Sequence, residues 1–355
     1  MSEVSDRLSH DYAILSQKLL RQTPKAGLYE SDLAGLSFAR RDDPERRENV
    51  LYPPCVGIVV QGSKQAVLGT REVCYQRGQY ILCCVDMPSS FSVSCSADRP
   101  YLTAVLRLDF PLLVEIFREL DARRSANGSA DAAYADDGAV ENGVPEDFAD
   151  EDADSPAAEA PALTEADEDD SWEDEQGEDP LGGCTVECGV QVCDITPELL
   201  NAFLRLVYLL DKDPEERSAI LPLIVREIHY YLATGPGGRA LRTFLMTRTQ
   251  SWQILRAITH MRRHCSERLP IESLARLVHM AESTFNRNFK RVTTLSPLQY
   301  HKRLKLFEAR RLMLQKGMNA ATACAAVGYE SQQQFTREYK RLFGCPPMKD
   351  ARRVR

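Results

Sequence analysis

The sequence predicts an α+β protein, in which a small antiparallel β domain with packed helices precedes an all-α domain. Three observations support this fold class. Apolar runs of strand length fill residues 50–110, amphipathic helical patterns dominate from residue 196 onward, and the last 106 residues repeat one helical motif. A chain of 355 residues is long enough for two or three domains, each with an apolar core of its own.

The N-terminal part divides into two expected regions. Residues 1–46 are expected to form a separate segment, with one helix from about Leu8 to Leu20 and then a polar, charged stretch. Residues 47–245 are expected to form the β domain, because their apolar runs are rich in Val, Ile, Tyr and Leu and are separated by Gly and Pro. The runs are CVGIVVQGSKQAVLG, VCYQRGQYILCCV and YLTAVLRLDF.

Helical patterns follow the strands. Pro111 opens PLLVEIFRELDARR, whose apolar residues recur at helical spacing. Thr196 and Pro197 form a helix-start signature at the beginning of TPELLNAFLRLVYLLD. A further helix, SAILPLIVREIHYYLAT, ends at the GPGG of residues 235–238. The last two helices are apolar enough to pack on the β domain, on each other or on a second subunit.

An acidic block interrupts the β domain. Residues 125–183 contain 21 acidic and no basic residues and show no apolar periodicity, which predicts a disordered insertion. The formal net charge of −8 for the whole chain therefore hides a basic C-terminal region. Residues 250–355 carry 21 Lys and Arg against 7 Asp and Glu, and this excess suits an electrostatic footprint on phosphate.

Composition disfavours several classes of protein. No apolar run approaches the ~20 residues of a membrane span, and the first residues lack a signal-peptide pattern, so we expect a cytoplasmic protein. The odd count of 11 Cys without an export signal predicts reduced thiols. No His lies between residues 11 and 228, and no Ser-His-Asp arrangement occurs there. We therefore expect no His-ligated metal site in the strands, no enzyme activity and no cofactor.

The C-terminal region repeats itself at an offset of 50 residues. ESTFNRNFKR (282–291) lies over QQQFTREYKR (332–341). Each copy has a short helix, a tight turn and a second helix with aromatic residues at i and i+4 on one side and basic residues opposite. This repeated pattern predicts two helix-turn-helix motifs, at about 270–292 and 319–342, joined by a longer helix. The alternative is a plain helical repeat with solvated Lys and Arg.

Both halves of the chain resemble one known family. Residues 252–355 resemble the DNA-binding domain of AraC/XylS-type transcriptional regulators, through LSPLQYHKRLKLFEARRLML, VGYESQQQFTREYKRLFGCPP and STFNRNFKRVT. Residues 50–245 resemble the cupin-like N-terminal domain of one branch of that family, through CVGIVVQGSKQAVLG, GQYILCCVDMP, LPLIVREIHYYLATGPGG and ALRTFL. The resemblance implies a sequence-specific DNA-binding transcriptional regulator, whose N-terminal domain senses a small molecule or an electrophile and dimerises.

The resemblance also assigns residues to DNA. Two recognition helices are expected to enter successive segments of the major groove, about one turn or ~34 Å apart. Arg and Gln side chains can bind guanine and adenine edges, while Ser, Thr and Asn are adaptable. The expected base contacts are Ser283, Thr284, Asn286, Arg287, Gln332, Gln333, Gln334 and Arg337. The expected phosphate contacts are Lys290, Arg291, Lys340 and Arg341.

The first recognition helix departs from the family pattern at its start. Ala281 stands where the family usually has Ser, and Ala cannot accept the free amide hydrogen bonds, at a cost of ~1 kcal/mol. Ser331 keeps that cap in the second copy. We therefore predict that the second copy contributes more to DNA affinity than the first.

Cysteine and histidine patterns leave alternatives open. Cys55, Cys83 and Cys84 are candidates for thiol sensing of an effector, and the alternative is that they are small buried apolar residues. The spacing of Cys184, Cys188 and Cys193 is not a common zinc pattern, and ordinary thiols compete there with a soft-metal site. His260 and His264, at i and i+4, could bind a metal or face solvent; no metal site is predicted.

The implied partners are promoter or operator DNA, a small-molecule effector, a second copy of the chain and RNA polymerase, with no membrane. Two other classes remain open: a redox or metal-sensing protein in which DNA binding is secondary, and an interaction scaffold. The acidic block is either a solvated loop or a cover for the basic faces around Arg287 and Arg337.

Overall fold

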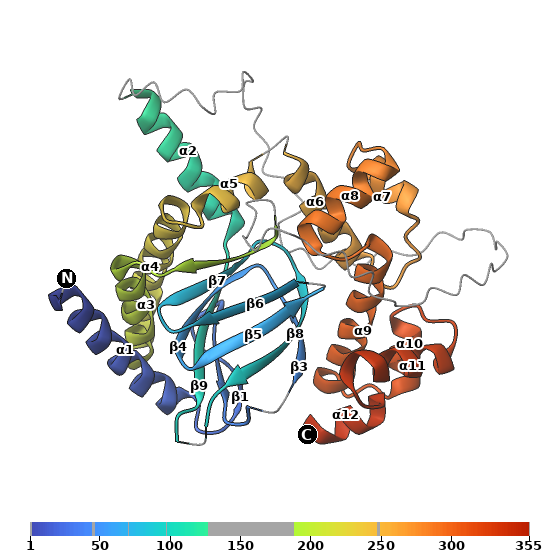
Figure 1. Ribbon diagram of the computed structural model, residues 1–355, viewed down its shortest axis with the longest axis horizontal. Helices are drawn as coiled ribbons and strands as arrows, with labels where there is room; N and C mark the ends of the chain where they lie inside the picture. The colour runs from blue at the N-terminus through green and yellow to red at the C-terminus, as the bar shows by residue number, and fades with distance from the viewer. Residues whose placement is uncertain are drawn as a thin grey trace.

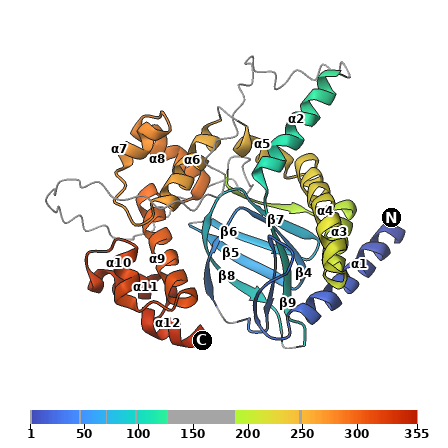
Figure 2. The ribbon, with the colours of Figure 1, turned by 180° about the vertical axis from the view of Figure 1, so that it is seen from behind.

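The computed structural model describes residues 2–44, 47–69, 71–96, 98–126, 188–246 and 249–354. An antiparallel β domain lies between a layer of helices and an all-α domain, which confirms the predicted α+β class (Figure 1). The N-terminus lies on the helical side of the β domain, and the C-terminus lies in the all-α domain (Figures 1 and 2).

Two antiparallel sheets make up the β domain. The larger sheet has the strand order β1-β2-β9-β4-β7-β10, and the smaller has the order β3-β8-β5-β6. The larger sheet contains β1 (Gly27–Glu30), β2 (Leu36–Arg41), β4 (Cys55–Gln61), β7 (Gln79–Cys83), β9 (Tyr101–Arg107) and β10 (Val190–Asp194). The smaller sheet contains β3 (Glu48–Tyr52), β5 (Ser63–Leu68), β6 (Arg71–Gln76) and β8 (Met87–Ser94).

Burial explains the different sequence patterns of the strands. β4 is buried from Cys55 to Val60, and such a continuous apolar run is typical of a strand that is covered on both faces. β5 instead alternates, with Lys64, Ala66 and Leu68 buried and the residues between them more exposed. The smaller sheet therefore has one core-facing side.

Helices cover the outer face of the larger sheet (Figures 1 and 2). α1 (Ser2–Gln22) buries Tyr12, Leu15 and Leu19 and contacts β4, β9 and a third helix. That helix is α3 (Pro197–Tyr208), which packs on α4 (Pro214–Thr234) and is followed by the short turn η2 (Leu209–Asp211). α2 (Phe110–Ala126) and α5 (Gly238–Leu245) pack against α4 and against each other.

The N-terminal region differs from the expectation. The helix spans Ser2–Gln22 instead of Leu8 to Leu20, and the polar stretch after it contains β1 and β2, which pair within the larger sheet. The expected boundary after residue 46 therefore falls inside the β domain. The charges mislead because β1 is a half-exposed edge strand and because Glu48 pairs with Arg41 of β2 at 2.7 Å.

The later helices follow their start signals. Thr196 accepts a hydrogen bond from Leu199 N, as predicted for the start of α3. α4 begins at Pro214, earlier than predicted, because Asp213 accepts a hydrogen bond from Glu216 N at 2.9 Å. It ends at Thr234, before the GPGG sequence.

The predicted acidic insertion separates α2 from β10. α2 continues to Ala126, two residues beyond the predicted end of the helix, and residues 127–187 lie outside the described part of the chain. The chain resumes in β10, which pairs with β7 at the edge of the larger sheet. β10, after this segment, and β7, before it, therefore belong to the same sheet.

The all-α domain is built around one long helix, α9 (Pro297–Gln315). Its described helices are α6 (Gln250–Arg263), α7 (Ile271–Leu277), α8 (Glu282–Thr293), α9, α10 (Ala320–Ala326), α11 (Gln332–Phe343) and α12 (Pro347–Val354). α7 and α8 form the first helix-turn-helix unit, and α10 and α11 form the second. The two units lie toward opposite ends of α9 (Figure 1).

The first unit and α6 are docked on the β domain. The buried side chain of Asp86 faces Arg262 of α6 at 3.4 Å, and its backbone oxygen accepts a hydrogen bond from Tyr300 OH at 2.5 Å. Thr294 Oγ1 donates to Leu68 O at 2.5 Å. Burial raises the pKa of Asp86, while the nearby Arg262 lowers it.

Asn49 of β3 binds the second part of the all-α domain. Its Nδ2 donates to Leu342 O of α11 at 2.6 Å, and its backbone oxygen accepts from Arg310 Nη1 of α9 at 3.2 Å. Arg310 also donates to Asp350 Oδ2 of α12 at 2.7 Å. One residue of the smaller sheet thus contacts both the long helix and the second recognition helix.

Candidate nucleic-acid interface and effector cleft

The two predicted recognition helices are α8 and α11, and aromatic residues fix the side that each one buries. Phe285 and Phe289 are fully buried, with ring centroids 5.5 Å apart, and Phe289 packs edge-on against Tyr300 at 5.3 Å. Phe335 and Tyr339 repeat this arrangement at 5.6 Å in the second unit. Because i and i+4 share one side of a helix, the polar side of each recognition helix is turned outward.

The turns of the two units differ by one residue. His279 and Gly328 both have a left-handed backbone, with φ of 55° and 72°. A side chain at Gly328 would place Cβ 1.9 Å from Ser266 O, so only glycine fits there. The first helices are related by an offset of 49 residues and the recognition helices by 50, because the second turn is longer.

The eight residues expected to contact bases lie on the outward sides of α8 and α11. Thr284 and Asn286 are partly exposed; the exposed residues are Ser283, Arg287, Gln332, Gln333, Gln334 and Arg337. Gln334 differs from its neighbours, because its Nε2 donates to Glu338 Oε1 at 3.1 Å. The side chains of Gln333 and Arg337 make no hydrogen bond or ion pair within the described part of the chain.

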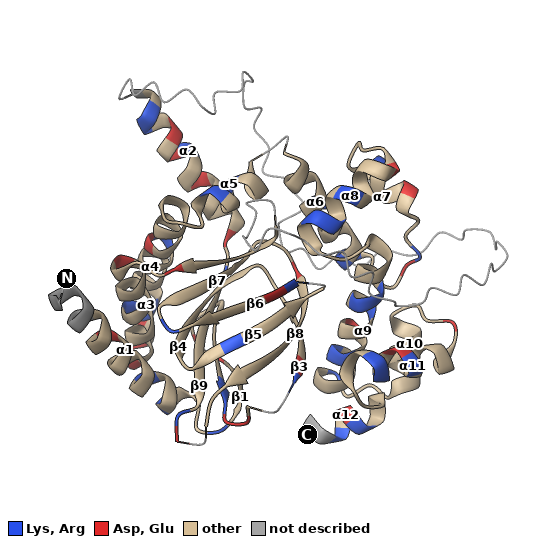
Figure 3. Ribbon diagram, viewed as in Figure 1, with Lys and Arg blue, Asp and Glu red and all other residues tan. Residues whose placement is uncertain are grey.

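Three of the four expected phosphate contacts are exposed. They are Lys290, Lys340 and Arg341, in the last turns of α8 and α11. Arg291 is partly buried, and its Nη2 donates to Gln250 Oε1 at 3.0 Å. Basic residues are also visible on α6 and α9 (Figure 3). The charge predicted from the sequence is therefore spread over the helices around both units.

The N-terminal caps of the recognition helices differ as the sequence indicates. Ala281 occupies the N-cap of α8 and offers no side-chain hydrogen bond. Ser331 caps α11 by accepting from Gln334 N at 3.3 Å. α9 has a complete capping box, in which Ser296 and Gln299 satisfy each other's backbone amides.

A cleft of about 700 Å³ lies between β3 of the β domain and the all-α domain. Leu51 of β3 and Phe307 and Leu312 of α9 are among its apolar lining residues. The basic residues along its wall are Arg262, Arg263, Arg310 and Arg311. The lining also includes Glu308, which pairs with Arg311 at 2.7 Å, so the cleft combines apolar side chains with guanidinium groups that are partly neutralised.

The interior of the β domain holds a buried lysine. Lys64 is 6% exposed and donates a hydrogen bond to Tyr52 OH. Its Nζ lies 3.6 Å from the ring centroid of Phe91 and 4.7 Å from that of Tyr52. Burial, followed by the charge of Arg41, lowers the pKa of Lys64 to about 7. The amine therefore titrates near neutral pH, where its protonated and neutral forms are both populated.

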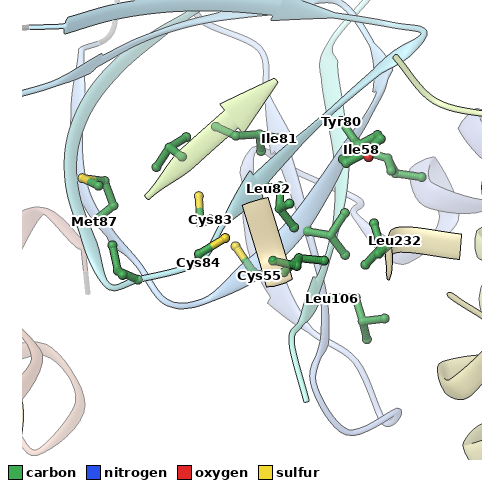
Figure 4. Close-up of a cluster of buried hydrophobic side chains, with 14 of the residues drawn as sticks. Cys55, Ile58, Tyr80, Ile81, Leu82, Cys83, Cys84, Met87, Leu106 and Leu232 are labelled. Carbon is green, nitrogen blue, oxygen red and sulfur yellow. The ribbon is translucent and has the colours of Figure 1, made fainter. Parts of the chain in front are cut away.

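The cysteines proposed for thiol sensing are buried. Cys55, Cys83 and Cys84 are at most 1% exposed and lie among apolar side chains of β4 and β7 (Figure 4). The hydrogen bond between Cys83 and Cys55, followed by burial, raises the pKa of Cys83, and burial raises that of Cys84. A reactive thiolate needs a lowered pKa and access to solvent, so the geometry does not support this hypothesis.

The predicted metal alternatives also find no geometric support. In the described residues, no group of three or more His, Cys, Asp or Glu is arranged to hold a metal ion. The rings of His260 and His264 stack at 4.3 Å, and His264 Nδ1 faces Glu267 at 2.8 Å. Cys188 and Cys193 form no disulfide, and Cys184 lies outside the described residues.

Sequence reasoning missed Lys64, Asn49 and Glu338. Strand alternation could have found Lys64, because it shares a face with Ala66 and Leu68. Helical spacing could have found Glu338, which lies between the core residues Phe335 and Tyr339. Nothing in the sequence indicates that Asn49 contacts residues nearly 300 positions away.

This geometry defines a class: a two-layer β domain joined to a domain of paired helix-turn-helix units. The helix-turn-helix domain family matches residues 274–353. The family described as AraC-type transcriptional regulator N-terminus matches residues 32–150 and 162–240, more than half of the chain. The chain therefore belongs to the AraC family of transcriptional regulators.

The curated relatives match part of the chain. The uncharacterized HTH-type transcriptional regulator YobQ of Bacillus subtilis is 31% identical over 91 residues, which cover 26% of this chain and 38% of YobQ. The RCS-specific activator RclR of Escherichia coli is 32% identical over 85 residues, 24% of this chain and 30% of RclR. ExsA of Pseudomonas aeruginosa is 26% identical over 159 residues, 45% of this chain and 56% of ExsA. The chain thus matches less than two thirds of each relative's length.

Solved structures share the overall fold. An apo ToxT variant from Vibrio cholerae gives a TM-score of 0.53 at 8% identity, and covers 92% of this chain and 100% of ToxT. ToxT bound to (E)-4-(8-methylnaphthalen-1-yl)but-3-enoic acid gives 0.50 at 6% identity, and covers 90% of this chain and 98% of ToxT. Among the described residues, no helix has the length and apolar character needed to cross a bilayer.

Proposed function

We propose that the protein is a transcriptional regulator that binds double-stranded DNA in a sequence-specific manner. The observation that carries this proposal is the pair of outward-facing recognition helices, held by one helix, α9, in a basic domain. α8 and α11 would enter neighbouring segments of the major groove on one side of the duplex. A cytoplasmic location follows from this target.

The exposed side chains divide into two roles. Arg287 on α8 and Gln333 and Arg337 on α11 have the donors that bind guanine and adenine edges. Lys290 and Lys340 lie near the C-terminal ends of the recognition helices, where they would hold phosphates and set the register. Removing a base contact should relax sequence preference, while removing a phosphate contact should weaken binding to all sequences.

The test is selection of preferred sequences from a pool of random duplexes by the full-length protein at defined salt. Arg337→Ala should weaken binding to the selected sequence by ~1–3 kcal/mol and relax its preference, with Arg287→Ala having the smaller effect. Lys340→Ala is the matched control, because it should weaken selected and random duplexes alike. Failure to retain any duplex at low salt would exclude the proposal, and a larger effect of Arg287→Ala would exclude the predicted order.

We further propose that a small anionic effector binds in the cleft between β3 and α9. The apolar side chains of Leu51, Phe307 and Leu312 suit the body of such a molecule. Arg262, Arg310 and Arg311 already face Asp86, Asp350 and Glu308, and the carboxylate of the ligand would accept further hydrogen bonds from these guanidinium groups. The relative ToxT has been solved with a naphthyl-substituted carboxylic acid. A ligand here would contact both domains and would so alter the orientation of the all-α domain relative to the β domain.

Thermal shift measurements with a panel of aromatic and alkyl carboxylic acids test this second proposal. A carboxylic acid should raise the melting temperature of the full-length protein, and the corresponding alcohol should not. Leu51→Trp, which fills the cleft from β3, should abolish the shift. An unchanged shift in Leu51→Trp would place the ligand elsewhere.

A further inference from the structure

The second recognition helix carries a buried carboxylate. Glu338 of α11 is 6% exposed. Its Oε2 accepts a hydrogen bond from Tyr329 OH at 2.6 Å, and its Oε1 accepts one from Gln334 Nε2 at 3.1 Å. Hydrogen bonds to an ionised acceptor are stronger than neutral ones. A single side chain therefore ties the turn of the second unit to the first turn of its recognition helix.

Tyr329 is itself held in place within the turn. Its backbone N donates to Cys324 O at 3.1 Å, and its ring packs edge-on against Phe335 at 5.4 Å. Burial and the contact with Glu338 raise the pKa of Tyr329, so its hydroxyl stays protonated and remains a donor. The Tyr329 side chain is thus positioned by its own contacts to donate to Glu338.

The equivalent place in the first unit lacks this tie. Met280 N donates to Ala275 O at 2.9 Å, as Tyr329 N does to Cys324 O, so Met280 takes the place of Tyr329. Asn288 takes the place of Glu338 and is 1% exposed. Its Nδ2 faces Met280 Sδ at 3.8 Å, and its Oδ1 has no hydrogen-bond partner in the described part of the chain.

This difference is energetically unfavourable for the first unit. A thioether is a weak acceptor, and a buried carbonyl without a donor loses its hydration without compensation. α8 also lacks an N-cap side chain at Ala281, whereas α11 is capped by Ser331. α11 is therefore held in its unit by more hydrogen bonds than α8 is in its own.

We propose that Glu338 is a positioning residue for DNA reading: by binding Tyr329 and Gln334 it fixes α11 and leaves Gln332, Gln333 and Arg337 to contact bases. Gln334, which the sequence assigns to base contact, acts instead as part of the support. α11 binds DNA in an orientation that is fixed before contact, whereas α8 adjusts its orientation when it binds. This inference rests on the proposed DNA binding and specifies how its two halves differ.

The experiment compares base preferences of full-length variants, using the same pool of random duplexes. Gln333→Ala should flatten the preference at its own base position by about tenfold. Gln334→Ala removes one hydrogen bond of the support, so it should weaken the preference across all positions read by α11 and not at one position alone. Tyr329→Phe keeps the ring against Phe335 and removes only the hydroxyl. It should flatten the base preferences in the second half-site, the bases that α11 contacts. It should leave the preferences in the first half-site, the bases that α8 contacts, unchanged.

Glu338 itself is tested by rescue. Glu338→Leu should flatten the second half-site as Tyr329→Phe does, whereas Glu338→Gln keeps an acceptor for Tyr329 and should preserve the preference. The melting temperature of each variant shows that it is folded, and Tyr329→Phe remains informative should Glu338→Leu not fold.

Two results would overturn the inference. One is that Gln334→Ala flattens a single base position as strongly as Gln333→Ala does and leaves the other positions read by α11 unchanged. The other is that Tyr329→Phe weakens all sequences equally without changing the preference, as a purely structural residue would. A wild-type protein that selects no sequence would instead reject the proposed function, and the inference with it.

Discussion

Lys64 shows how one residue can oppose the stability of its own domain. Its ammonium is surrounded by the rings of Phe91 and Tyr52, and its hydrogen-bond partner is the neutral hydroxyl of Tyr52. Glu48 raises the pKa of Lys64 only through its charge, because the Glu48 carboxylate is bound by Arg41. The aromatic contacts offset part of the loss of hydration, but the pKa still falls from 10.5 to about 7.

This shift predicts that stability rises with pH. Between pH 7 and 10.5 the unfolded chain binds a proton at Lys64 that the folded chain has released, so the free energy of unfolding increases across that window. Lys64→Met should raise the free energy of unfolding by roughly 1–3 kcal/mol below pH 7, with a gain that shrinks toward pH 10.5. Denaturant unfolding at several pH values measures this, and Lys316→Met, at an exposed site, serves as control. A gain that did not depend on pH would contradict the assignment.

Exposure ranks the cysteines by reactivity. Cys74 on β6 is exposed, whereas Cys55, Cys83 and Cys84 are buried. Brief treatment of the native protein with iodoacetamide should label Cys74 and leave those three thiols unlabelled until the protein is unfolded. Peptide mass spectrometry distinguishes the sites. Rapid labelling of Cys55 in the native state would restore the thiol-sensing hypothesis.

The elements of the all-α domain show how local signals determine helix ends. Thr249, Ser296, Asn319 and Ser331 each accept a backbone amide at the start of a helix. α7 and α8 start without a side-chain cap, at Pro270 and Ala281, and the C-terminal end of α8 at Thr294 also adopts a left-handed backbone without glycine, with φ of 62°. α11 ends instead at Gly344, which adopts the same backbone region without strain. The first recognition helix is thus weaker at both ends.

Restoring the missing cap should stabilise the first unit. Ala281→Ser provides an acceptor for the free amides of α8 and should raise the free energy of unfolding by about 1 kcal/mol. Ser331→Ala should lower it by a similar amount. Chemical denaturation followed by circular dichroism measures both changes. Equal and negligible effects would show that the termini of these helices do not limit stability.

Periodic patterns predicted the helices well because each signal acts within one turn of chain. The aromatic pair Phe285 and Phe289 indicated the buried face of α8, and Thr196 indicated where α3 starts. β1 and β2 were missed because their charged residues are satisfied by partners such as Glu48, which is not adjacent in the sequence. The roles of Gln334 and Glu338 were missed because exposure and residue type alone do not reveal a hydrogen bond between them.

The charge distribution is a property of the whole molecule. The 21 acidic residues between 125 and 183 follow α2, while the basic excess, 21 Lys and Arg against 7 Asp and Glu, lies in residues 250–355 of the all-α domain. Deleting residues 127–183, which spares α2, should tighten binding to random duplexes at low salt if the block competes with phosphate, and the gain should fade as salt rises. Fluorescence anisotropy across a salt series measures this. An unchanged affinity at low salt would identify the block as a solvated insertion.

The contacts of β3 connect the β domain to the second part of the all-α domain. Asn49 binds α11 and α9 at once, and Arg310 extends that connection to Asp350 of α12. Movement of β3 would therefore displace the second helix-turn-helix unit. The first unit is instead bound to the β domain through the backbone oxygens of Asp86 and Leu68. A ligand between β3 and α9 would act at the junction of these two sets of contacts.

The length of α9 has a consequence for the DNA itself. Its 19 residues rise about 28 Å, somewhat less than one turn of B-form DNA, and they fix the angle between the two units. With a rigid spacer of this kind, binding depends on the helical twist between the two groove segments as well as on their bases. Supercoiling that unwinds the segment between half-sites would rotate one groove away from its recognition helix, so the superhelical state of the chromosome would become an input to the regulator.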